Sequence, residues 1–157
     1  MQKPIDKPEF WKERIQNALK DHYSVYVAHE ALWNRINQVH NELLDKIIPQ
    51  DSKVLDAGCG YGRWSHKFKN YTGVDFSPDF LSKAKSKYPD KEFIQSKLEV
   101  LPFKDKEFDW AFCVSIKKMV VDNQGEEKWL EMEKELKRVA KNILILEYEV
   151  PEIYEVL

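Results

Sequence analysis

Residues 53–65, KVLDAGCGYGRWS, contain the pattern that decides the fold and the function of this chain. Three of the five glycines in the sequence, Gly58, Gly60 and Gly62, lie here at alternate positions, directly after an apolar run. Glycine permits a tight turn and positive φ, and it lets a ligand approach the backbone without a Cβ in the way. A plain turn between a strand and a helix needs only one or two glycines. Three glycines at this spacing therefore favour a ligand-binding loop.

The segments that follow predict an α/β fold. Short apolar runs alternate with helical segments from residue 52 onward, and in a doubly wound sheet of this kind the strands are parallel and covered on both faces. Five strands are expected at residues 53–58, 71–76, 91–97, 108–116 and 141–150, with helices at 63–70, 77–88 and 125–140. Ser77 is a candidate N-cap for the second of these helices, with Pro78 at its first position. The helix at 63–70 is expected to point its unpaired N–H groups at the ligand.

The N-terminal part of the chain reads as helical. Residues 9–48 contain no Gly or Pro, and a helix is expected around residues 10–20 and another at 31–48. The second helix carries an apolar stripe made of Leu32, Ile36, Val39, Leu43 and Ile47. We therefore expect a single domain over residues 1–157, with a helical extension at 1–50 and an α/β core at 51–157.

Composition argues against several classes of partner. The net charge is −2 with 33% charged residues, so a nucleic acid or an anionic membrane would need a local basic patch. No apolar run approaches the roughly 18 residues of a membrane span, and the N-terminus lacks the apolar core of a signal peptide. The two cysteines, Cys59 and Cys113, show no metal-binding spacing. We expect a cytoplasmic protein without a metal.

The acidic residues near the glycines indicate which ligand the loop binds. A dinucleotide fingerprint is G-x-G-x-x-G, whereas this loop is G-x-G-x-G with Arg63 at the third dinucleotide position. Asp56, two places before the first glycine, would repel a pyrophosphate but attract an ammonium group. Asp75 ends the next strand 19 residues later, where a carboxylate can accept both ribose hydroxyls. Adenosine that carries a positively charged amino-acid arm fits this loop better than NAD.

Three segments in order, VLDAGCGYGR, GVDFSPDFLSKAK and LPFKDKEFDWAFCV, resemble the class I S-adenosylmethionine-dependent methyltransferases, in particular those that act on small molecules. The resemblance covers about residues 54–147 and implies a Rossmann-like sheet, S-adenosylmethionine as cofactor and methyl transfer by direct displacement. The family usually adds an antiparallel hairpin after the fifth strand, and we expect this shortened C-terminus to lack it. A cofactor-binding subunit without activity, or a methyltransferase acting on RNA or protein, are the alternatives.

The resemblance also implies which residues bind the cofactor. Asp56 and the loop backbone would hold the methionine portion, Asp75 the ribose and Phe76 the adenine face. The full implied set is Asp56, Ala57, Gly58, Cys59, Gly60, Asp75, Phe76, Lys97, Leu98, Cys113, Val114 and Ser115. Lys97 departs from the family, which commonly has an Asp there to accept a hydrogen bond from the adenine amino group. Since a lysine cannot accept, backbone groups or Glu99 must provide that contact.

The acceptor site is expected under the N-terminal helices, which often fold over the cofactor in this family. The expected substrate-binding residues are Tyr23, Tyr26, His29, Trp33 and Lys117, and the candidate catalytic residues are His29 and Tyr23. A neutral histidine can serve as a base, although displacement at a sulfonium methyl needs one only when the nucleophile is protonated. The alternative is that these residues have no role in binding, with the aromatic side chains in the core and the histidine and lysine exposed to solvent.

The last predicted strand bears on the oligomeric state. An apolar strand at a sheet edge exposes N–H and C=O groups that can pair with another chain. We therefore expect this edge to be covered by a second copy in a homodimer, or by the chain's own C-terminal tail or N-terminal helices.

Overall fold

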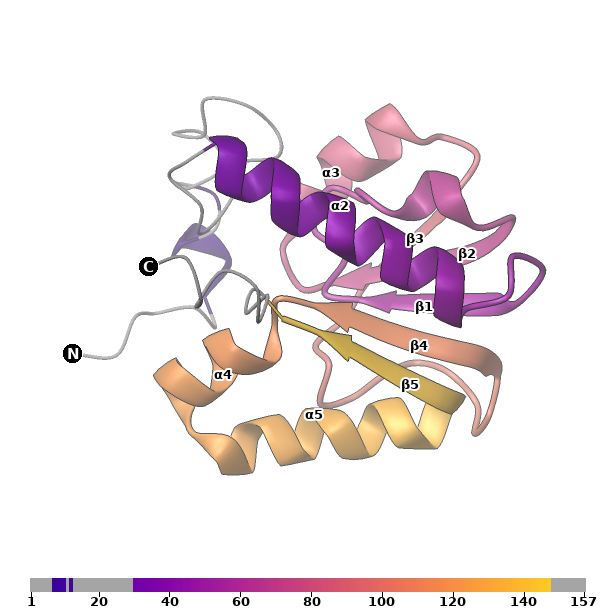
Figure 1. Ribbon diagram of the computed structural model, residues 1–157. Coiled ribbons are helices and arrows are strands. Elements are labelled where there is room, and N and C mark those ends of the chain that lie inside the picture. The colour runs from indigo at the N-terminus through magenta and orange to yellow at the C-terminus, as the bar shows by residue number, and fades with distance from the viewer. Residues whose placement is uncertain (1–6, 11, 13–29, 148–157) are drawn as a thin grey trace.

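The computed structural model describes residues 7–10, 12 and 30–147, and Figure 1 shows their arrangement. Five parallel strands form one sheet in the order β3-β2-β1-β4-β5. The strands are β1 (Lys53–Ala57), β2 (Asn70–Asp75), β3 (Glu92–Gln95), β4 (Phe108–Val114) and β5 (Ala140–Leu146). The direction in which the strand order proceeds reverses between β1 and β4. The α/β, doubly wound, five-stranded sheet predicted from the sequence is confirmed.

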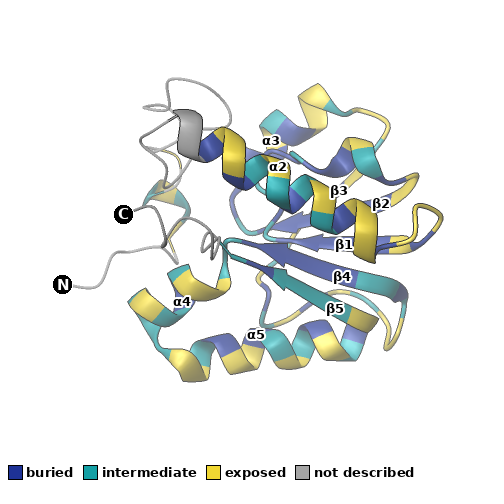
Figure 2. Ribbon diagram, in the orientation of Figure 1, coloured by how far each residue is buried: buried dark blue, intermediate teal, exposed yellow. Residues whose placement is uncertain are grey.

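Helices cover both faces of the sheet. On one face lie α2 (Glu30–Ile47) and α3 (Pro78–Lys87), and on the other lie α4 (Lys117–Gln124) and α5 (Glu126–Val139) (Figure 1). In Figure 2 the buried residues concentrate on the strands, whereas the outer surfaces of the helices are exposed. Burial on both faces explains why these strands are apolar runs rather than alternating patterns.

The segment after the glycine loop differs from the prediction. The expected helix at residues 63–70 is absent, and a short 3-10 helix over Ser65–Lys67 stands in its place. Its turns are closed by the N–H of Ser65 donating to the carbonyl of Gly62 and that of Lys67 donating to Trp64. Phe68 is then extended and 1% exposed, because its ring packs in the core directly before β2. The helix N-terminus that was expected directly after the glycine loop is therefore absent.

Helix α4 was not predicted. It has only eight residues, no side-chain N-cap hydrogen bond, and a single buried residue, Val120. It ends at Gly125, whose φ of +94° lets the chain turn into α5. A helix this short without a cap signal has no periodicity that distinguishes it from a loop.

The buried stripe of α2 is rotated from the predicted one. Trp33, Ile36, His40 and Leu44 are buried, whereas Ile47 is 36% exposed. Of the other predicted stripe residues, Val39 and Leu43 are half-buried and the side chain of Leu32 lies outside the described set. Both stripes have helical spacing, and the true one contains a polar histidine. Hydropathy alone therefore displaced the predicted stripe from the buried one, and Ile36 is common to both.

The remaining expectations for the N-terminal part fall mostly on residues outside the described ranges. Residues 8–10 and 12 are helical, which agrees with the start of the helix expected around 10–20. Within the ranges that the structure describes, no helix combines the length and the apolar character needed to cross a membrane.

His40 joins α2 to the end of the sheet. Its Nε2 lies 2.7 Å from the carbonyl oxygen of Glu147, just past β5, and the residue is 2% exposed. Burial lowers the pKa of His40, and the nearby Arg63 lowers it further, against the opposite effect of the carbonyl contact. The folded protein therefore favours the neutral form of this imidazole.

We predict that His40 makes folding sensitive to mild acid. As the pH falls through the ordinary histidine pKa of about 6.5, the unfolded chain gains a proton that the folded chain resists, so stability falls. The melting temperature should drop more between pH 7.5 and 5.5 in the wild-type protein than in His40→Gln, which keeps a donor at this position. Calorimetric melts at both pH values measure the difference, and equal drops would contradict the assignment.

Candidate functional site

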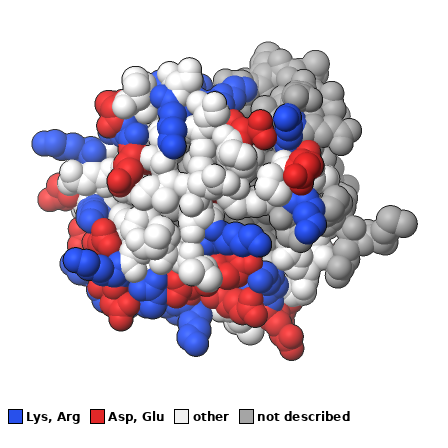
Figure 3. Space-filling view, turned by 180° about the vertical axis from the view of Figure 1, so that it is seen from behind, with Lys and Arg blue, Asp and Glu red and all other residues white. Residues whose placement is uncertain are grey.

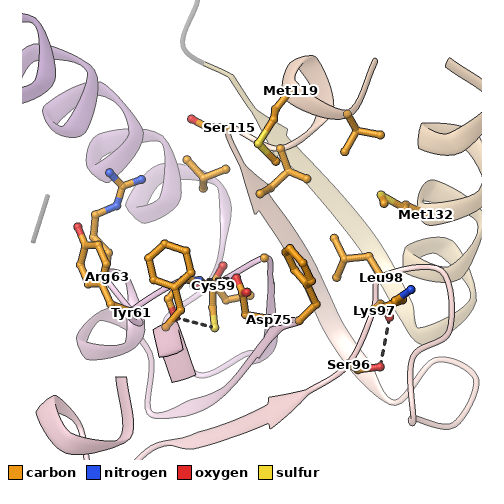
Figure 4. Close-up of a pocket in the computed structure, with 18 of the residues that line it drawn as sticks. Cys59, Tyr61, Arg63, Asp75, Ser96, Lys97, Leu98, Ser115, Met119 and Met132 are labelled. Atoms are coloured by element: carbon orange, nitrogen blue, oxygen red, sulfur yellow. Dashed lines mark hydrogen bonds between the residues drawn. The ribbon is translucent and has the colours of Figure 1, made fainter. Parts of the chain in front are cut away.

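A cavity of about 260 Å³ opens at the carboxyl edge of the sheet, beyond the ends of β1, β2 and β4. This is the position at which doubly wound sheets bind ligands, since the loops diverge where the strand order reverses. In Figure 4, Tyr61 and Arg63 lie at one end of the cavity and Leu98 and Met132 at the other, with Asp75 between them.

The glycine loop forms the floor and is tied to the end of β2. The N–H groups of Gly58 and Cys59 donate to the carbonyl of Val74 at 2.8 and 2.9 Å. Gly58 has a φ of +77°, and a Cβ there would lie 2.7 Å from Cδ1 of Ile116. Only glycine fits both constraints. The positive φ values expected at the three glycines are present, at +77°, +54° and +77°.

Asp75 fixes the loop from the other side. One carboxyl oxygen accepts the N–H of Gly60 and the other accepts the N–H of Ser77, each at 2.9 Å. Ser77 caps α3 as predicted, since its hydroxyl accepts the N–H of Phe80 at 3.4 Å. Burial raises the pKa of Asp75 to about 6, and these backbone donors oppose the rise. Each carboxyl oxygen still has a lone pair that can accept a hydroxyl.

Asp56 is a second buried carboxyl that lines the cavity. It is 1% exposed and accepts the hydroxyl of Tyr71 at 2.7 Å. Burial raises the pKa of Asp56 to about 7, while the Tyr71 hydrogen bond and the charge of Arg63 lower it. A cationic ligand group would stabilise the ionised form of this carboxyl.

Aromatic and sulfur-containing side chains form the walls. Tyr61 and Phe80 make a buried pair against which Phe10, Phe76 and Met119 pack. At the end of the cavity nearest α2, the guanidinium of Arg63 lies between two indole rings. It is 4.5 Å from the ring centroid of Trp33 and 4.4 Å from that of Trp64.

Most of the residues predicted for the cofactor line this one cavity. Those that do are Asp56, Gly58, Cys59, Gly60, Asp75, Phe76, Lys97, Leu98, Val114 and Ser115. Ala57 and Cys113 do not, because both are fully buried in the core cluster under α4 and α5. Cys113 was expected among the cofactor-binding residues together with its neighbour Val114, but successive residues of a strand face opposite sides of the sheet.

The predicted acceptor residues are less well placed. Trp33 lines the cavity, whereas Lys117 does not and its ammonium lies 5.9 Å from the ring centroid of Trp129. Tyr23, Tyr26 and His29 lie outside the residues that the structure describes.

Sequence reasoning missed about half of the residues in the cavity wall. The lining residues that were not predicted are Tyr61, Arg63, Trp64, Phe80, Ser96, Ile116, Met119, Val120, Gln124, Lys128 and Met132. Those on α4 and α5 follow the glycine loop by more than fifty residues, so only the crossover of the fold brings them to it. Arg63, by contrast, stands directly after the third glycine, and that adjacency was a usable signal.

Comparison of the chain with known protein families agrees with this geometry. The family described as "Methyltransferase domain" matches residues 54–142. The chain therefore belongs to this family, the class I methyltransferases, whose cofactor is S-adenosylmethionine.

Individual relatives are similar over only part of their length. A protein of uncharacterised function from Methanocaldococcus jannaschii is 33% identical over 104 residues, which are 64% of this chain and 41% of that protein. The demethylmenaquinone methyltransferase of Chlorobaculum tepidum is 34% identical over 64 residues, 38% of this chain and 26% of that enzyme. A Pyrococcus horikoshii crystal structure superposes with a TM-score of 0.59 at 28% identity, over 79% of this chain and 62% of that one. The chain thus spans less than half the length of these two curated relatives.

The residues present fit S-adenosylmethionine. Two buried carboxyls line the cavity, one suited to an ammonium group and one to ribose hydroxyls. A Cβ on Gly60 would meet nothing closer than 3.9 Å, so the backbone there borders open space. A pyrophosphate, in contrast, would meet Asp56 and Asp75 and be repelled.

We predict that the buried charge of Asp56 lowers the stability of the ligand-free fold. Its folded pKa of about 7 lies above the ordinary 3.8, so its contribution to stability falls as pH rises between these values and is lowest above pH 7. Asp56→Asn removes this charge, and at pH 8 it should raise the melting temperature by about 2–6 °C, corresponding to roughly 1–2 kcal/mol. Asp51→Asn, the same exchange on an exposed carboxylate, should leave it unchanged. The gain should shrink at pH 5, and an unchanged or lower value at pH 8 would refute this origin.

Proposed function

We propose that this chain transfers the methyl group of S-adenosylmethionine to a small-molecule acceptor by direct displacement. The observation that carries the proposal is one continuous cavity, which runs from two buried carboxyls to an uncharged wall. That wall contains Phe80, Ile116 and Met119, and Figure 4 shows Met119 beside Ser115 at the end of β4. Such a wall suits a small organic acceptor and keeps water from the reacting atoms.

Different residues of the cavity would bind different parts of the cofactor. Asp56 and the Gly58–Gly60 backbone would hold the amino-acid arm, and Asp75 would orient the ribose through its hydroxyls. The sulfonium of the cofactor supplies a methyl group on an excellent leaving group. The protein therefore needs mainly to align the acceptor, and positioning alone can lower a barrier by about 7–11 kcal/mol.

A base is required only for an acceptor that is protonated at the working pH. His29 and Tyr23 remain our candidates for that role, and Tyr26 and Trp33 remain candidates for enclosing the acceptor. Trp33 is supported by its position in the cavity wall next to Arg63. Lys117 is less well supported, because its ammonium packs over Trp129.

Surface charge supports a small acceptor over a nucleic acid. Figure 3 shows Lys and Arg side chains interspersed with Asp and Glu on the described part of that face. A polyanion would need a surface of one sign, and the net charge is −2. The Chlorobaculum tepidum relative is a demethylmenaquinone methyltransferase, a name that indicates a small-molecule acceptor for that enzyme.

We predict that the protein binds S-adenosylhomocysteine saturably and does not bind NADH. Asp75→Ala should weaken binding by roughly 1.5–3 kcal/mol, or about 10- to 150-fold, because a charged acceptor of ribose hydroxyls is lost. Asp79→Ala, which removes a half-buried acid in the first turn of α3 that does not line the cavity, should leave the affinity unchanged. Titration calorimetry measures these affinities, with melts to show that each variant is folded. Failure of the wild-type protein to bind at millimolar concentration would refute the proposed cofactor.

The acceptor class has its own test. The protein is incubated with methyl-labelled S-adenosylmethionine and a cell extract, and small molecules are then separated from RNA and protein. The label should appear in the small-molecule fraction. Label confined to RNA or protein would contradict the small acceptor, and saturable binding without transfer would favour a non-catalytic subunit.

We also propose a homodimer that pairs through β5. Among the described strands none pairs with its outer edge, and Ile143, Leu144 and Ile145 are only half-buried. Such an edge is a template for a second chain. Light scattering should give the mass of two chains, and a monomer at tens of micromolar would rule the dimer out.

Cytoplasmic location remains part of the proposal. Cys59 and Cys113 are both free and buried. Free thiols are typical of a reducing compartment, where disulfides are rare.

A further inference from the structure

A second cavity of about 230 Å³ adjoins the first one. Trp33, Tyr61 and Arg63 line both cavities, so a ligand in one can extend toward the other. Figure 4 shows Tyr61 and Arg63 at the end of the first cavity that lies away from Leu98 and Met132. The other described residues around the second cavity are Asn34 and Asn37 of α2, and Lys87 and Tyr88 at the end of α3.

The second cavity carries positive charge. Its described lining contains two cations, Arg63 and Lys87, and no carboxylate. The ammonium of Lys87 lies 5.8 Å from the ring centroid of Tyr61 and 5.5 Å from that of Tyr88. Against the larger effect of burial, the charge of Arg63 also lowers the pKa of Asp56 in the first cavity. An anionic ligand group would therefore be attracted to the second cavity, whereas a cationic group would be attracted to Asp56.

Arg63 has the geometry that a carboxylate needs. Its guanidinium lies between the indole rings of Trp33 and Trp64, 4.5 and 4.4 Å from their centroids. Both indoles are buried, so they hold the guanidinium in one place. A guanidinium carries five N–H donors in one plane, and two of them match the two oxygens of a carboxylate. Arg63 therefore favours a carboxylate by direction as well as by charge.

Asn37 and the aromatic rings indicate the rest of the ligand. The side-chain oxygen of Asn37 is buried and has no hydrogen-bond partner among the described residues. Since a buried acceptor without a partner costs free energy, a hydroxyl or amino group of a ligand can supply the missing hydrogen bond. The rings of Trp33, Tyr61 and Tyr88 line the same cavity and suit a flat ring. The ligand that fits is an aromatic acid with such a donor.

We propose that the methyl acceptor is an aromatic carboxylic acid, whose carboxylate binds Arg63 and Lys87 in the second cavity and whose reacting group extends into the first. This inference rests on the proposed function. The carboxylate is thereby kept away from the cofactor's sulfonium, so a hydroxyl or amine of the acid takes the methyl. A lone pair on that group forms the bond to the methyl carbon, while the carbon–sulfur bond breaks and its electrons stay on sulfur. The proton of the group passes to water or to a base.

The test measures how strongly the protein prefers an anion to a neutral molecule of similar shape. The probes are 2-naphthoate and 2-naphthamide, titrated calorimetrically with and without saturating S-adenosylhomocysteine. The wild-type protein should prefer the carboxylate by about ten-fold or more in both conditions, because the neutral amide cannot accept charge-assisted hydrogen bonds as a carboxylate does. Arg63→Gln should reduce the preference to within about three-fold, and Lys87→Gln should weaken it by about three-fold.

Lys85→Gln is the matched control, because Lys85 is an exposed lysine of α3 that lines neither cavity. It should keep the wild-type preference. The ratio of two dissociation constants on one preparation does not depend on how much of the protein is folded. In a protein that binds S-adenosylhomocysteine, equal affinity for the two probes or binding of neither would overturn this inference alone. An unchanged preference in Arg63→Gln would do the same.

Two further outcomes separate the cofactor from the acceptor. Loss of naphthoate binding when S-adenosylhomocysteine is added would assign Arg63 to the carboxylate of the cofactor and overturn its role toward the acceptor. Absence of S-adenosylhomocysteine binding to the wild-type protein would overturn the proposed function, and the acceptor assignment with it, whatever the naphthoate result.

Discussion

The two hydrogen bonds to the Asp75 carboxylate are the contact on which the rest of the site depends. They tie the N–H of Gly60, in the loop after β1, to the N–H of Ser77, at the start of α3. Two adjacent strands and the helix after the second of them are thereby held in one arrangement at the carboxyl edge of the sheet. The residue proposed to orient the ribose is thus also the one that shapes the loop beneath it.

Burying two carboxyls in one cavity has a physical consequence for the ligand-free protein. Desolvation raises the pKa of both Asp56 and Asp75 toward neutrality, against the hydrogen bonds that favour their charged forms. Among the described residues neither carboxyl forms an ion pair, so a cationic ligand would find an electrostatic partner already positioned. The two buried carboxyls therefore lower the stability of the ligand-free protein and raise its affinity for a cationic ligand.

The parts of the site that the sequence predicted are local in the chain. The glycines, Asp56 and Asp75 lie at the ends of two consecutive strands. Their residue types and spacing were therefore enough to predict a ligand-binding loop with two carboxyls. Gly73 leaves room for the hydroxyl of Tyr71, which donates to Asp56, since a Cβ at residue 73 would lie 2.9 Å from that hydroxyl. This role was not predicted, because Gly73 lies inside β2 and not in a loop. Cys113 was misplaced because a strand alternates its faces and nothing in the segment shows which residue points to the cavity.

The unpredicted parts depend on contacts between distant segments. α4 has too few residues and no cap, so Met119 and Val120 could not be assigned to the site. The burial of His40 depends on a carbonyl more than one hundred residues away, which no helical pattern can show. Glu99 was considered only as a substitute for Lys97, and its pairing with Lys128 needed the packing of α5 against the sheet.

The most direct test of the account is a crystal structure of the complex with S-adenosylhomocysteine. The account predicts the amino-acid arm over Gly58–Gly60 beside Asp56, the ribose hydroxyls on Asp75, and the adenine between Leu98 and Met132. Density for the nucleoside at the Arg63 end of the cavity, or outside the cavity, would contradict it.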